Sequence, residues 1–108
     1  TRHIFDAPAF AAMKRGAILI NTGRGGLLDL DALADSLASG HLGGAGLDVF
    51  EEEPLPDNHA IRNAPNTIQT SHVAWFSESS VPRLQQLAAD EAARALRGEP
   101  LLNQVNRT

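Results

Sequence analysis

Short apolar runs alternate with stretches of mixed apolar and polar residues along this chain. The runs occupy residues 17–21, 45–49 and 67–70, and we expect each to form a strand. The first run, AILIN, is typical of a strand in a parallel sheet that is covered on both faces. A turn must follow it, because GRGG at 23–26 continues neither a strand nor a helix.

The mixed stretches have apolar residues at helical spacing, with capping residues before them and glycines after them. Leu30, Leu33 and Leu37, for example, recur on one face of a helix. We expect helices from Asp6 to Gly16, from Asp29 or Asp31 to Gly40, and from Ser77 or Ser80 to about Arg97. Residues 51–66 hold three prolines, and we expect a long surface loop there.

Strands that alternate with helices predict an α/β fold built on a doubly wound parallel sheet. The first expected element is a helix, which in such a fold should follow a strand. Three parallel strands also leave one sheet edge open and one face partly uncovered. We therefore expect the C-terminal part of a larger domain. No G-x-G-x-x-G follows a strand in this sequence, so a pyrophosphate loop is expected upstream of Thr1.

The composition is ordinary for a globular protein, with 108 residues, 43% of them hydrophobic and 20% charged. The formal net charge is −4 and no basic stripe is present, which argues against direct nucleic-acid binding. The absence of cysteine excludes disulfides and thiolate metal sites, and we expect no metal. No run approaches the roughly 18–20 apolar residues that span a bilayer, and no secretory pattern opens the chain, so we expect a cytoplasmic protein without membrane contact.

A reactive polar side chain follows each of the three expected strands. Arg24, Glu53 and His72 should meet at one sheet edge, because ligands bind at the carboxyl ends of parallel strands. Arg24 suits a carboxylate or carbonyl, His72 suits proton transfer, and Glu53 suits support of the imidazolium. This combination predicts an enzyme site. The alternatives are a solvated arginine in a tight turn, a structural histidine and a solvated acidic loop.

Two further residues are candidates. Asp48 lies inside an apolar strand, where an unpartnered carboxylate is costly. Its partner is either a nicotinamide ring with its carboxamide or a backbone amide. Trp75, beside Phe76, either walls a substrate pocket or packs the last helix onto the sheet.

Three segments, in order, resemble a known family. INTGRGGLLDLDAL (20–33), LGGAGLDVFEEEPLP (42–56) and TSHVAW (70–75) are similar to the C-terminal half of the nucleotide-binding domain of D-isomer-specific 2-hydroxyacid dehydrogenases. The resemblance covers roughly residues 10–106. It implies a Rossmann-like sheet and an oxidoreductase that transfers a hydride between NAD(H) and a 2-hydroxy or 2-keto acid, with NADP as the alternative cofactor.

The resemblance implies a role for each matching residue. Arg24 would bind the carboxylate and carbonyl of the substrate, His72 would be the catalytic acid, and Glu53 would pair with His72. The residues implied to contact the cofactor are Thr22, Gly23, Arg24, Asp48 and His72.

The chain departs from the family pattern beside the histidine. Ser71 replaces the proline of T-P-H, which should loosen the turn slightly and leave His72 in place. AWFSE at 74–78 resembles the C-terminal-binding-protein branch, in which the tryptophan contacts bound keto acid, so Trp75 becomes a substrate-binding candidate. That branch includes corepressors, so the alternatives to an enzyme are an NAD-sensing binding protein and an inactive isolated fragment.

The resemblance also implies a division of the chain. Residues 1–76 would be the C-terminal part of the NAD-binding domain, and residues 77–108 a crossover helix and a segment that returns to the substrate domain. The family further implies a homodimer.

Overall fold

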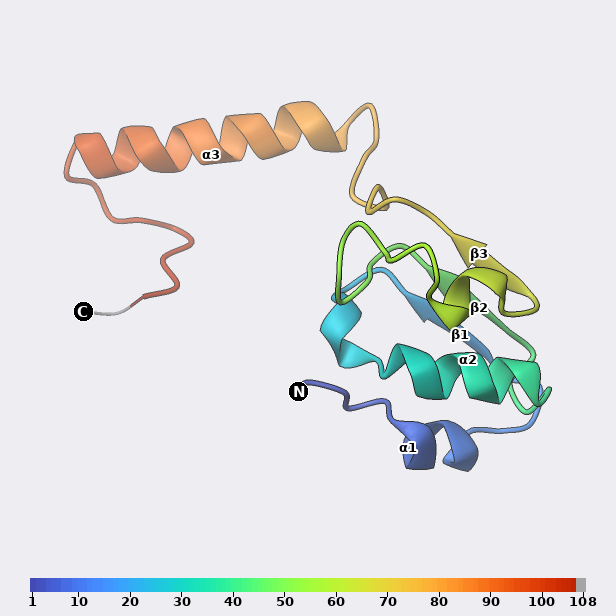
Figure 1. Ribbon diagram of the computed structural model, residues 1–108. Coiled ribbons are helices and arrows are strands. Elements are labelled where there is room, and N and C mark those ends of the chain that lie inside the picture. The colour runs from blue at the N-terminus through green and yellow to red at the C-terminus, as the bar shows by residue number, and fades with distance from the viewer. Residues whose placement is uncertain (107–108) are drawn as a thin grey trace. The chain divides into compact units, whose positions relative to one another are not determined.

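The computed structural model describes residues 1–106 and forms two compact units, one of residues Thr1–Ala74 and one of the described residues from Trp75 onward. The strands lie in the first unit, and the second contains the long helix α3 (Ser80–Leu96) (Figure 1). The boundary between the units falls two residues before the one expected from the sequence. The assignment of the second unit to another domain stays a prediction.

One parallel sheet organises the first unit. Its strands are β1 (Ile18–Asn21), β2 (Gly44–Leu47) and β3 (Thr67–Gln69), in the order β1-β2-β3. Ile20 is in register with Gly46, and Gly46 with Ile68. The expected parallel α/β arrangement is confirmed. Because the strands are parallel, the segments that follow them all emerge at one edge of the sheet.

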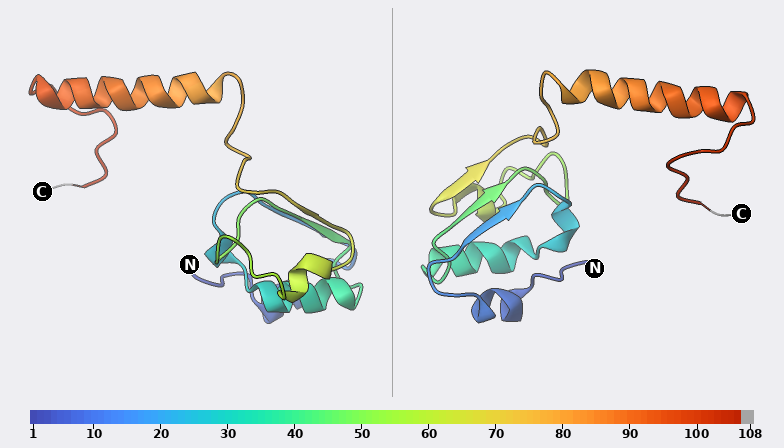
Figure 2. Two further views of the ribbon diagram at one scale, coloured as in Figure 1. Left: turned by 45° about the horizontal axis from the view of Figure 1, so that its top comes forward. Right: turned by 180° about the vertical axis from the view of Figure 1, so that it is seen from behind.

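Two helices of the first unit lie on one side of the sheet, and they are α1 (Ala7–Ala12) and α2 (Leu30–Ala38) (Figure 2). Each begins at an aspartate, Asp6 or Asp29, whose side chain accepts a hydrogen bond from the amide three residues later, at 3.0 and 3.1 Å respectively. The N-cap of α2 is therefore Asp29 and not Asp31. Gly40 follows the helix with φ of 69°, a conformation that glycine adopts without steric cost.

The hydrophobic core lies between the sheet and these helices. Leu19 and Leu47 from the strands pack with Leu33 of α2 and Phe10 of α1. The other face of the sheet is exposed in this unit, since β1 alternates exposed and buried residues. The exposed isoleucines on that face are Ile18, Ile20 and Ile68. The apolar run at 17–21 predicted a strand covered on both faces, but in this unit only one face is covered. This agrees with the other expectation, that three strands leave one face of the sheet partly uncovered.

The loop between β2 and β3 contains a short 3-10 helix, η2 (Ala60–Asn63), which the sequence pattern does not predict. Ile61 of η2 is fully buried, and η2 packs against α2. The Arg62 guanidinium donates hydrogen bonds to the carbonyl of Leu55 and, at 2.8 Å, to that of Pro56. These contacts hold the proline-rich loop, which also carries Glu53, in a defined path.

The second unit begins with a serine-rich turn and continues as α3. The Ser80 hydroxyl accepts from the Ser77 amide at 2.8 Å and donates to the Trp75 carbonyl at 2.7 Å. Gly98, with φ of 68°, follows the end of the helix. Nowhere in residues 1–106 does a helix combine the length and the apolar character that crossing a membrane requires.

Candidate active site

The turn after β1 carries Thr22, Gly23 and Arg24, and it leads into a single 3-10 turn, η1 (Gly25–Leu27). Arg24 is exposed, and its guanidinium donates a hydrogen bond to the Gly23 carbonyl at 2.8 Å. An exposed cation therefore lies at the carboxyl edge of the sheet, where a ligand would approach.

Gly25 brings this turn against the segment that follows β2. A Cβ built on Gly25 would lie 1.9 Å from the carbonyl carbon of Phe50 and 2.3 Å from the nitrogen of Glu51. Only a residue without a side chain allows two backbones to approach this closely. The turn with Arg24 and the loop with Glu53 are therefore in direct backbone contact.

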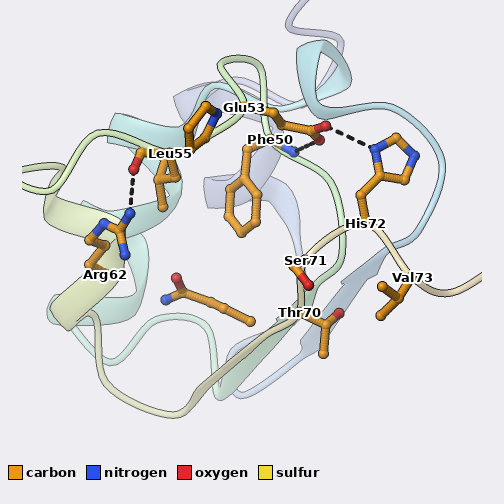
Figure 3. A pocket seen from close by; sticks show the side chains of 10 residues that line it. Phe50, Glu53, Leu55, Arg62, Thr70, Ser71, His72 and Val73 are labelled. Carbon is orange, nitrogen blue, oxygen red and sulfur yellow. Dashed lines mark hydrogen bonds and ion pairs between the residues drawn. The ribbon is translucent and has the colours of Figure 1, made fainter.

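Glu53 and His72 form a hydrogen-bonded pair at this edge of the sheet (Figure 3). Nδ1 of His72 lies 2.9 Å from Oε2 of Glu53, and Oε1 of Glu53 accepts from the Phe50 N–H at 2.9 Å. The Phe50 N–H first, and His72 after it, lower the pKa of Glu53 below its ordinary value. Because an ionised carboxylate only accepts hydrogen bonds, Nδ1 of His72 carries a proton in this pair.

The backbone of His72 adopts an uncommon conformation. Its φ of 57° lies in the left-handed region, where histidine is one of the more frequent residues with a side chain. Such conformations concentrate at functional sites, where the surrounding structure holds them. With Ser71 before it, His72 still lies beside Glu53, in keeping with the expectation that the missing proline leaves it in place.

Asp48 joins the end of β2 to the turn that carries His72. Asp48 is 3% exposed, and its carboxylate accepts from the Thr70 hydroxyl at 2.5 Å and from the amides of Val73 and Ala74 at 2.9 and 2.8 Å. The Thr70 hydroxyl, followed by the two amides, lowers the pKa of Asp48 against the opposing effect of burial. Of the two partners expected for Asp48, a nicotinamide ring or a backbone amide, the structure shows backbone amides. A contact between Asp48 and a cofactor stays a prediction.

A cavity of about 680 Å³ opens beside the Glu53–His72 pair. The ring of Phe50 lies between this pair and Arg62 in Figure 3, and Leu55 adds to the apolar part of the lining. Arg24 lies outside the lining of this cavity. The space is large enough for a small organic acid, and a few polar groups in an apolar wall are typical of ligand pockets.

A smaller groove of about 260 Å³ runs over the exposed face of the sheet toward the strand ends. Its apolar lining includes Ile20, Gly46 and Ile68, and its polar groups include Thr22 and Asp48. This combination suits a flat ring that carries a polar substituent.

Trp75 begins the second unit of the structure. Its ring packs edge to face against Phe76, with ring centroids 5.7 Å apart and an interplanar angle of 80°. Trp75 is 53% exposed. Its expected contact with substrate stays a prediction.

Two residues of this region have roles that the sequence reasoning misses. Phe50 supports Glu53 through its backbone N–H, which leaves no signal in the sequence. Asn21 bonds to the turn that carries Arg24 through its side chain. The sequence signal is the asparagine itself, because asparagine commonly hydrogen-bonds the backbone two residues on, here the N–H of Gly23.

Known sequences are similar to this chain over most of its length. A family model described as "D-isomer specific 2-hydroxyacid dehydrogenase, NAD binding domain" matches residues 1–74. The (S)-sulfolactate dehydrogenase of Chromohalobacter salexigens is 48% identical over 96 residues, which are 89% of this chain and 31% of that protein. Glyoxylate/hydroxypyruvate reductase B of Citrobacter koseri is 41% identical over 106 residues, which are 98% of this chain and 33% of that protein. The chain thus spans about a third of the length of these relatives.

A solved structure agrees with the sequence comparison. The D-isomer specific 2-hydroxyacid dehydrogenase of Xanthobacter autotrophicus Py2, in complex with NADPH and MES, is 39% identical with a TM-score of 0.83. The match covers 98% of this chain and 43% of that one.

Proposed function

Because the chain belongs to the D-isomer specific 2-hydroxyacid dehydrogenase family, within its NAD-binding domain, we propose that the full-length protein transfers a hydride between NAD(H) and a 2-hydroxy or 2-keto acid. The observation that supports this proposal most directly is the Glu53–His72 pair, which lies at the same sheet edge as the Arg24 turn. This edge combines a proton donor with an anion-binding group, and reduction of a keto acid needs both.

The side chains divide the work of the reaction. Arg24 binds the substrate carboxylate through its guanidinium and polarises the C2 carbonyl, which orients the substrate. His72 donates a proton to the carbonyl oxygen as that oxygen gains negative charge, and in the reverse direction it removes the hydroxyl proton. The carboxylate of Glu53 stabilises the charged imidazole through the 2.9 Å contact at Nδ1. NADH, when bound, supplies the hydride that C2 receives.

The residues at the strand ends fit the nicotinamide end of such a cofactor. The groove over Ile20, Gly46 and Ile68 offers an apolar surface for the ring, and Thr22 and Asp48 add a hydroxyl and a carboxylate. The carboxylate can accept from the carboxamide N–H and the hydroxyl can donate to its oxygen, so the two groups suit the carboxamide of the ring. We propose that the residues that hold this end are Thr22, Gly23, Arg24, Asp48 and His72. NAD is the proposed cofactor, and NADP is the alternative.

The finer expectations belong to the same proposal. From the resemblance they are a homodimer, a contact between Trp75 and substrate, and closeness to the C-terminal-binding-protein branch, and from the sequence pattern a cytoplasmic location. Light scattering of the full-length protein measures the oligomeric state, and a monomer would contradict the dimer.

Replacing His72 by alanine tests the proposed reaction. Turnover of the full-length protein with NADH would be measured on glyoxylate, hydroxypyruvate and the 2-keto acid of sulfolactate, which the names of the relatives suggest. We expect His72→Ala to lower turnover by roughly 10²–10⁴-fold, as loss of a general acid does. His3→Ala is the matched control, since His3 also pairs with a glutamate, Glu51, at 2.8 Å. Turnover of His72→Ala equal to that of His3→Ala would exclude His72 as the acid.

A further inference from the structure

Asn21, the last residue of β1, has its side chain inside the turn that carries Arg24. Asn21 is 7% exposed. Its Nδ2 donates to the carbonyl oxygen of Arg24 and its Oδ1 accepts from the Gly23 N–H, both at 3.0 Å. The amide therefore bonds to the backbone on both sides of the Gly23–Arg24 peptide.

The backbone of Asn21 is itself part of the sheet. Asn21 is in register with Leu47, and its carbonyl accepts from the Asp48 N–H at 3.0 Å. A buried side chain on a strand thus holds an exposed turn. Asparagine offers a donor and an acceptor in one plane, whereas an ionised aspartate only accepts, so aspartate cannot make both bonds.

The same turn determines where the Arg24 side chain lies. The guanidinium donates a hydrogen bond to the Gly23 carbonyl at 2.8 Å. The N–H of the same glycine donates to the side chain of Asn21. On the outer side, Gly25 packs against the backbone of Phe50. The turn is therefore held from within by Asn21 and from outside by Gly25.

We propose that Asn21 is a positioning residue that orients Arg24 toward the substrate carboxylate, an inference that rests on the proposed function of Arg24. Asn21 acts through the backbone of Gly23 and Arg24 and not by contact with substrate. Without its amide, the strand keeps its backbone pairing and the turn loses the two bonds that tie Gly23 and Arg24 to the strand. The guanidinium then occupies several positions, and substrate binding weakens.

The test is a double-mutant cycle in the full-length protein, measured as KM for whichever keto acid of the panel above turns over fastest. We expect Asn21→Ala to raise KM for the keto acid roughly 10- to 100-fold, as misplacement of a binding group does. Asn21→Asp keeps the acceptor for Gly23 and loses the donor, so it should also raise KM. In the double variant, Asn21→Ala should add little to Arg24→Ala, since groups that act through one another are not additive.

Thr67→Val is the matched control. The Thr67 hydroxyl donates to the Ala64 carbonyl at 3.0 Å and accepts from the Gln69 side chain at 3.3 Å, so this variant also removes two side-chain hydrogen bonds, at the start of β3. It should leave KM unchanged. Circular dichroism shows whether each variant is folded. If Asn21→Ala is unfolded, the KM of Asn21→Asp decides whether Asn21 positions Arg24.

Two results would overturn the proposal. The first is a wild-type KM in the folded Asn21 variants, and the second is additive effects of Asn21→Ala and Arg24→Ala on KM. Either result would exclude the positioning role of Asn21 and leave the proposed role of Arg24 intact. An unchanged KM in Arg24→Ala would remove the role of Arg24 as well, so failure of the proposed function is distinguishable from failure of this inference.

Discussion

Replacing Gly25 by alanine tests how closely the Arg24 turn must pack against the loop that carries Glu53. The added methyl carbon would lie 1.9 Å from the carbonyl carbon and 2.1 Å from the carbonyl oxygen of Phe50, where ordinary contact begins near 3.4 Å. The obstacle is backbone, which has no flexible end that could move aside. The two segments must therefore separate by about 1.5 Å, a strain of the kind that overpacking produces.

This separation displaces functional groups on both sides of the contact. Arg24 precedes Gly25 directly, and Glu53 accepts a hydrogen bond from the Phe50 N–H. A displacement of about 1 Å costs on the order of 10²-fold in rate, so we expect kcat/KM for the keto acid to fall by about 10²-fold. We also expect the free energy of unfolding to fall by about 1–3 kcal/mol, as is usual for overpacking.

The assay combines steady-state reduction of the keto acid with urea unfolding followed by circular dichroism. Gly26→Ala is the control, because the nearest atom to its added carbon is a carboxylate oxygen of Glu51 at 3.9 Å. Neither glycine has φ in the left-handed region, so backbone strain does not distinguish the two variants. They differ in the contact that the added Cβ makes. Gly26→Ala should be neutral or more stable by about 0.4–1 kcal/mol. Wild-type kcat/KM and an unchanged unfolding midpoint in Gly25→Ala would refute the reasoning.

Two further substitutions probe the carboxylates. Glu53→Gln removes the carboxylate oxygen that accepts from Nδ1 of His72, so turnover of the keto acid should fall while KM changes little. Wild-type turnover would contradict the pairing. Thr70→Val removes the hydroxyl that most lowers the pKa of Asp48. A lowered native pKa stabilises the protein above the unfolded-state pKa, and this contribution is lost as the pH falls through the native value. Acid unfolding of Thr70→Val, followed by circular dichroism, should therefore begin at a higher pH than in the wild type, and an equal midpoint would count against this role.

The elements of the fold follow from signals that act within a few residues. Asp6 caps α1 as predicted, and the leucine spacing places α2 and its buried face. The expected end of the first helix at Gly16 is wrong, because α1 ends at Ala12. The sequence leaves Asp29 and Asp31 as equal candidates for the N-cap of α2, and the structure selects Asp29. η2 escapes prediction because a proline-rich loop has no helical periodicity, and its stability comes from burial of Ile61 against α2.

The three consecutive glutamates show where sequence reasoning ends. They have the same chemistry, and only the resemblance to a family singles out Glu53. In the structure Glu51 pairs with Arg2 and His3, whereas Glu53 pairs with His72. The path of the loop decides between them, because it directs the two side chains to different neighbours.

The sequence by itself determined the alternation of strands and helices and the placing of Arg24 and His72 after strands at one edge of a parallel sheet. Caps, periodicity and the parallel topology are enough for that. Tertiary structure decided that Asp48 holds the His72 turn and that Gly25 packs against Phe50. The hydrogen bonds of Asp48 reach residues 22 to 26 positions later in the chain, and Gly25 contacts a segment equally distant in sequence. The relative position of such distant segments depends on how the whole chain packs.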